Sequence, residues 1–229
     1  MHFELLYKPT HSLAIAHLQA NEGVRAESSA MIGMTSNIQV ATNAGSAKSG
    51  GFLKSLKRGV LGGESFFTNH FTAVGGPGHV SLAPGLCGDM VVHTVSPNED
   101  LLIQGQSYVA APDSVQIDTQ FQGFKGLFSG ESLFFLKASG SGPVLINAFG
   151  AIEALDLDGE MVVDTGHLVA FSSFIRYEVS TAAPSWITSF LSGEGLVLKM
   201  QGRGRVYVQS RNPSEYGTTV ATELPPRKG

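Results

Sequence analysis

Alternating apolar and polar residues mark three strands that share one phase along the chain. Apolar residues hold the first and third places of IQV (38–40), VQI (115–117) and IRY (175–177), with a polar residue between them. A period of two turns one face of a strand to a core and the other to water or a neighbour. Because a slip of one residue would expose the whole apolar set, the shared phase predicts three equivalent strands.

Two glycine motifs accompany these strands and also return three times. A Gly-Glu step begins at Gly63, Gly130 and Gly193. A Gly-x-Gly-x-Val step follows, beginning at Gly76, Gly140 and Gly202. Because glycine adopts positive φ readily, we interpret each Gly-x-Gly step as the turn of a hairpin, and Asp158-Gly159 as a further turn. Self-similarity at this spacing predicts a repeat architecture.

The expected fold is all-β. Three repeated β-sandwich or short double-stranded β-helix units would surround a pseudo-threefold axis, with little helix. Residues 1–211 would form one body of three repeats (about 1–84, 85–149 and 150–211). Residues 212–229 contain few apolar side chains and a Pro-Pro step, so we expect an extended or disordered tail. The best helical pattern is GFLKSLKRGV at 51–60.

Composition narrows the classes of function. The net charge is −4, without a basic stripe, so we expect no nucleic-acid partner. Because Cys87 is the single cysteine, the chain cannot form an internal disulfide, which fits a reducing compartment. We expect Cys87 to be a small buried thiol. Residues 1–8 lack a signal-peptide pattern, and no stretch approaches the roughly 18 apolar residues of a membrane span. We therefore expect a cytoplasmic protein.

Repeat-related carboxylates are one candidate site. Glu64, Glu131 and Glu194 each follow the glycine of a Gly-Glu step. If the three side chains faced a common axis, they could share a cation such as Ca²⁺ or raise one another's pKa. The alternative is that each glutamate caps nearby N–H groups of its turn or pairs with a surface lysine.

A basic cluster is the second candidate site. Lys48, Lys54, Lys57 and Arg58 lie beside Phe52 in a glycine-rich stretch. Such a segment can contact anionic lipid or a protein partner. The alternative is a solvated helix face that covers one end of the fold.

Histidines raise the hypothesis of a cupin-like, metal-dependent enzyme. His70 and His79 flank one Gly-x-Gly step and could approach each other across a hairpin. Cupins, however, place two histidines one residue apart on a strand, and no His-x-His occurs in the sequence. We therefore expect no metal and no other cofactor.

LGGESFF at 61–67 follows a loop rich in Gly and Lys, and GPGHVSLAPG lies downstream at 76–85. A triplicated β chain with these motifs resembles bacterial members of the "altered inheritance of mitochondria" family, over about Phe3 to Arg211. The resemblance implies a tryptophan-RNA-binding-attenuator-like fold, which is a short double-stranded β-helix, and a biochemical function that is not known. It supplies no catalytic residue.

Together these observations favour a non-enzymatic binding or scaffold protein that assembles through sheet edges or flat β faces. We expect a homo-oligomer or a protein partner. The alternatives are the cupin-like enzyme and a peripheral membrane organiser that acts through residues 50–60.

Overall fold

The structure is a computed structural model that describes residues 1–43, 68–120, 134–181 and 196–225. It consists mainly of β-strands, as the sequence predicts. We group the strands into three consecutive units along the chain. Unit 1 contains β1 (His2–Leu6), β2 (Leu13–Leu18), β3 (Gly23–Glu27), β4 (Met31–Met34), β5 (Ile38–Asn43), β6 (Thr68–Ala73) and β7 (Gly78–Leu82).

Two further units follow along the chain. Unit 2 contains β8 (Met90–Val95), β9 (Leu101–Gln104), the 3-10 helix η1 (Gly105–Ser107), β10 (Tyr108–Pro112), β11 (Val115–Gln120), β12 (Phe135–Gly140) and β13 (Gly142–Asn147). Unit 3 contains β14 (Ile152–Asp164), the 3-10 helix η2 (Thr165–His167), β15 (Leu168–Ser172), β16 (Arg176–Thr181) and β17 (Leu196–Gln209). The helix α3 (Pro213–Glu223) comes last.

The same antiparallel pairings recur in the three units. In unit 1, β7 lies between β2 and β4, while β6 lies between β3 and β5. In unit 2, β13 lies between β8 and β10, while β12 lies between β9 and β11. In unit 3 the long strands β14 and β17 pair along their whole length, β15 adds to the second half of β17, and β16 adds to its first half.

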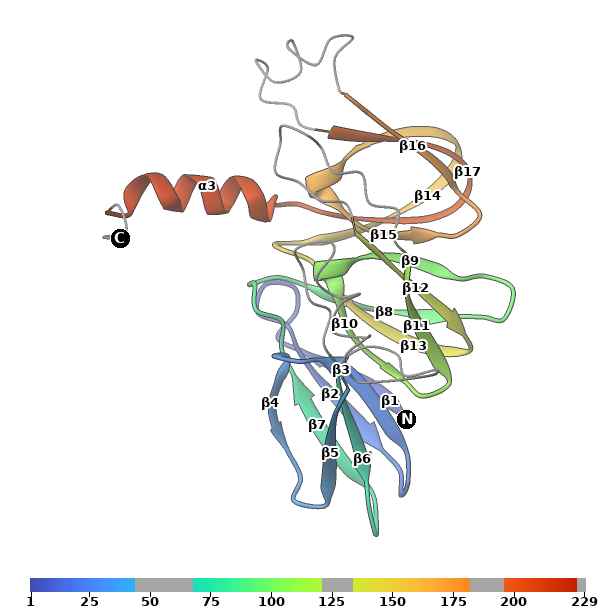
Figure 1. Ribbon diagram of the computed structural model, residues 1–229, viewed down its shortest axis with the longest axis vertical. Helices are drawn as coiled ribbons and strands as arrows, with labels where there is room; N and C mark the ends of the chain where they lie inside the picture. Colours follow the sequence, from blue (N-terminus) through green and yellow to red (C-terminus); the bar gives the residue numbers. More distant parts are fainter. Residues whose placement is uncertain (44–67, 121–133, 182–195, 226–229) are drawn as a thin grey trace.

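Two sheets run across the boundaries between units. One has the order β5-β6-β3-β10-β13-β8 and joins units 1 and 2; another has the order β11-β12-β9-β15-β17-β14 and joins units 2 and 3. Figure 1 shows the units one after another along the long axis, with unit 2 in the middle. Among the described strands none joins unit 1 to unit 3, so the units form an open row, and a threefold axis stays a prediction.

The alternating strands are where the sequence predicts them. β5 and β11 begin at Ile38 and Val115, and β16 begins just after Ile175. These three side chains are buried in the apolar clusters of their units. Val40, two residues further along β5, is 45% exposed, so the alternation does not predict its burial correctly.

The Gly-x-Gly steps do not form hairpins, which corrects that prediction. β6 and β7 flank the first step but belong to different sheets, and so do β12 and β13. In unit 3 the step lies inside β17, where Gly202 and Gly204 have φ of +137° and +158°. These values favour glycine. In units 1 and 2 the step carries the chain from one sheet to another, whereas in unit 3 it lies within one long strand.

Two more predictions are wrong. Asp158-Gly159 is not a turn, because β14 runs through it and pairs with β17 on both sides. The segment after Arg211 is not extended: α3 begins at Pro213 after the N-cap Asn212, whose side chain accepts hydrogen bonds from the backbone N–H groups of Ser214 and Glu215. Capping and a proline at the first turn start this helix despite its few apolar residues.

Candidate functional site

The joints between units are buried sheet contacts. β10 pairs with β3, placing Ala110 opposite Ala26, and β15 pairs with β9, placing Ala170 opposite Ile103. Every residue of β10 and β15 is buried. Their sequences, YVAAP and LVAFS, are almost wholly apolar, as expected for strands covered on both faces.

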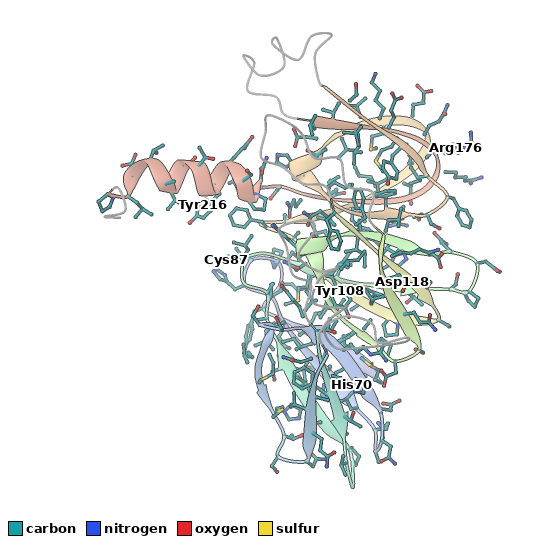
Figure 2. The ribbon with its side chains drawn as sticks, viewed as in Figure 1. His70, Cys87, Tyr108, Asp118, Arg176 and Tyr216 are labelled. Carbon is teal, nitrogen blue, oxygen red and sulfur yellow. The ribbon has the colours of Figure 1, made fainter. Side chains whose placement is uncertain are left out.

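A bulge marks each joint, and a side-chain hydrogen bond adds to the first. The Tyr108 hydroxyl donates to the carbonyl oxygen of Arg25 at 2.8 Å, and Figure 2 shows Tyr108 where units 1 and 2 meet. The register of β10 shifts around Val109, and that of β15 shifts around Val169. Both valines are fully buried. A bulge bends a strand and re-aims one side chain, here into the joint.

The two ends of the row present strands that lack this cover. β4 pairs with β7 only, within the described strands. Its Met31, Ile32 and Met34 are 39%, 58% and 41% exposed. At the other end, the second half of β14 pairs with β17 on one side, and its Val162 is 63% exposed. No other described strand pairs with either edge, so each leaves outward N–H and C=O groups beside exposed apolar side chains within the described ranges.

Charged groups surround the joint between units 1 and 2. The Asp113 carboxylate lies 3.0 Å from the Arg25 guanidinium and 2.9 Å from the His70 ring nitrogen Nε2. Arg25 and Asp113 are both substantially exposed, so each pair contributes little to stability. They link Arg25 of β3 and His70 of β6 in unit 1 to Asp113, which follows β10 in unit 2.

The joint between units 2 and 3 has a more buried network. The Ser172 hydroxyl donates to Glu99 at 2.8 Å and accepts from the Arg205 backbone N–H at 3.0 Å. His93 and Tyr207 share a hydrogen bond of 2.9 Å between Nδ1 and the hydroxyl. Burial lowers the pKa of His93 and raises that of Tyr207, so both side chains favour their neutral forms.

Three histidines form a row across sheet β1-β2-β7-β4. His2 lies opposite His17, and His17 lies opposite His79. The rings of His2 and His17 stack with their centroids 4.6 Å apart, and the centroids of His17 and His79 are 6.3 Å apart. The Glu4 carboxylate oxygen Oε2 lies 2.8 Å from Nε2 of His17. Even so, the described part of the chain holds no group of three or more His, Cys, Asp or Glu side chains placed to bind a metal ion.

The candidate residues from the sequence fall largely outside the described ranges. These are Lys48, Phe52, Lys54, Lys57, Arg58, Glu64, Glu131 and Glu194. His70 and His79 are described but lie on strands of different sheets, with Asp113 and His17 as their contacts. Cys87 is exposed and not buried as expected, and Figure 2 shows it at the surface of the molecule.

Sequence reasoning missed the end strands. β4 reads MIGM, with no charged residue and no proline, and it is too short to show alternation. β4 can be recognised as an uncovered strand only by comparison with β10 (YVAAP) and β15 (LVAFS), which occupy the equivalent positions in units 2 and 3. Within the described ranges, no helix has the length and apolar character needed to cross a membrane.

Comparisons with known proteins agree with this architecture. The family described as mitochondrial biogenesis AIM24 matches residues 3–211. An uncharacterised protein of Streptococcus pyogenes serotype M6 is 29% identical over 213 residues, which cover 91% of this chain and 85% of the relative. A crystal structure of a Streptococcus pyogenes protein is similar with a TM-score of 0.81 and 26% identity, and the match covers 97% of this chain and 99% of that one. With the family match spanning almost every described strand, the chain belongs to the mitochondrial biogenesis AIM24 family.

Proposed function

We propose that this protein is a non-enzymatic scaffold that binds through the uncovered strand edges at the two ends of its row of units. The proposed architecture is of the tryptophan-RNA-binding-attenuator type, and the recurrence of the same pairings in three units supports it. The observation that carries the proposal is the exposed apolar edge of β4, which contrasts with the complete burial of β10 and β15.

Edge pairing suits the chemistry of these ends. Main-chain hydrogen bonds supply affinity when a strand is added to a sheet, and alternate side chains supply specificity. Natural edge strands are often protected by charged residues or proline, but β4 contains neither. An apolar edge of this kind gains free energy when a strand covers Met31, Ile32 and Met34.

Ile32→Lys is the variant that tests this function. Ile32 is 58% exposed, so the folded chain should tolerate lysine with a change of at most about 0.5 kcal/mol in the free energy of unfolding. A bound strand that buried residue 32 would have to desolvate the ammonium group, which is costly. Val40→Lys is the matched control, because Val40 is 45% exposed on a different edge strand, β5.

The readout is native mass spectrometry of gently purified protein. We expect the wild type and Val40→Lys in assemblies heavier than the 24.1 kDa chain, and Ile32→Lys at the mass of the single chain. The proposal fails if the wild type is a single chain that carries one equivalent of a metal or metabolite and Ile32→Lys behaves identically. That result would favour an enzyme.

A further inference from the structure

We propose that the strand covering β4 is the second half of β14 from another copy of this chain. This inference rests on the proposed function and names its partner. The copies would join head to tail, and each new joint would repeat the two joints that already exist inside the chain, β3 with β10 and β9 with β15.

The outer strands of unit 3 and of unit 1 match the two halves of a sheet that runs across a joint. Each complete sheet takes three strands from one unit and continues into three strands of the next: β5-β6-β3 into β10-β13-β8, and β11-β12-β9 into β15-β17-β14. Unit 3 ends in β16, the first half of β17 and the second half of β14. Unit 1 begins with β4-β7-β2, extended by β1. Joining these halves would give the same strand order for a third time.

The bulges align β4 with β10 and β15. Met31 pairs with Leu82 and Gly33 with Ser81, and the register shifts between them, leaving Ile32 as the extra residue. Val109 and Val169 are the extra residues of β10 and β15 at the same place. Ile32 is exposed, whereas both valines are fully buried by the preceding unit. β4 therefore has the local shape of a joint strand without its partner.

A shared connection aligns β14 with β3 and β9. Three residues separate Glu27 from β4, Gln104 from β10 and Asp164 from β15. The Gln104 and Asp164 side chains each accept a hydrogen bond from the backbone N–H two residues further on. Arg25, Leu102 and Val162 each lie two residues before the residue that ends their strand, so they are equivalent. Arg25 and Leu102 both pair with the next unit.

The internal joints then give the register of the new one. Ala111 lies opposite Arg25, and Phe171 lies opposite Leu102. The equivalent pair between copies is Met34 of one chain opposite Val162 of the next, and both are exposed in the single chain. The joint is heterologous, so it leaves one edge free at each end until the copies close into a ring or extend as a filament.

Disulfide trapping tests both the partner and the register. Residues directly opposite in an antiparallel pair have Cα atoms about 4.5–5.5 Å apart, which a disulfide can span. In a Cys87→Ser background, which removes the exposed native thiol, one chain carries Met34→Cys and a second, isotopically heavy chain carries Val162→Cys. A chain carrying Val40→Cys, at an exposed valine on β5, replaces either one as the matched control.

We expect oxidation of the mixture to give a light–heavy disulfide dimer at least tenfold above any pair that contains Val40→Cys. Each cysteine variant alone should stay uncrosslinked. Dimers of Met34→Cys with itself would overturn the head-to-tail joint, because they indicate β4 pairing with β4. No crosslink above the Val40→Cys level would also overturn it. In both cases the scaffold proposal survives if Ile32→Lys still dissolves the assembly, and it fails separately if Ile32→Lys has no effect.

Discussion

Phe171 is the position at which the coupling between units can be measured. It lies in β15, between β9 of unit 2 and β17 of unit 3, and it is fully buried. Its ring meets Phe135 and Tyr177 edge to face, with centroids 5.4 Å and 5.2 Å away. Phe171→Leu keeps the site apolar but removes both ring contacts and leaves a small cavity.

The expected cost follows from these contacts. Each aromatic pair contributes about 0.5–1.5 kcal/mol beyond the area it buries. With the partial cavity, the free energy of unfolding should fall by about 2–3 kcal/mol. For a chain of this size, about 2–4 °C of Tm are lost per kcal/mol, so we expect a drop of about 4–12 °C.

Differential scanning calorimetry supplies the readout. Because sheets run across both joints, we expect one cooperative transition that moves as a whole. Phe174→Leu is the control, since Phe174 is 60% exposed and the same change should cost at most about 0.5 kcal/mol. Two transitions, of which Phe171→Leu moves only one, would refute the coupling. A drop no larger than that of Phe174→Leu would refute the packing argument.

Three other predictions follow from single positions. Gly88→Ala should cost more than about 2 kcal/mol in a urea titration, because a Cβ would overlap the carbonyl oxygen of Ala148; an unchanged midpoint would contradict this. Asn212→Ala should weaken α3 by about 1 kcal/mol, seen as faster amide exchange confined to that helix; equal exchange would show that the cap is not needed. Burial lowers the pKa of His93 from its ordinary value of 6.5, so at pH values between the two the unfolded chain binds more protons than the folded chain. The free energy of unfolding should therefore rise as pH increases from the lowered pKa to 6.5. His93→Gln should flatten this rise in pH-dependent melts, and an unchanged slope would contradict the assignment.

The strands were predictable where two faces differ strongly. Ile38, Val115 and Ile175 are buried while the residue that follows each of them is polar, and that contrast is visible in the sequence. The role of the glycine steps was not predictable, because a glycine with positive φ serves a hairpin and a corner between sheets equally well. Only the pairing partners of β6 and β7, which are distant in sequence, distinguish the two.

The candidate site was harder to predict than the fold. β4 is a short apolar strand with the composition of a core strand, and it is exposed where no other described strand pairs with its outer edge. Charged and nucleophilic side chains can be recognised in a sequence. A strand edge binds through main-chain N–H and C=O groups, which almost every residue carries. The Asn212-Pro213 start of α3 was readable as a cap and a first-turn proline, but the low apolar content outweighed it.

Amide hydrogen exchange of the wild-type protein over a range of protein concentrations tests the central claim most directly. The head-to-tail scaffold account predicts that protection of Met31–Met34 and of residues 161–164 rises together with concentration, while Ile38–Asn43, on another sheet edge, does not change. Exchange at both end strands that is the same at every concentration would contradict the account.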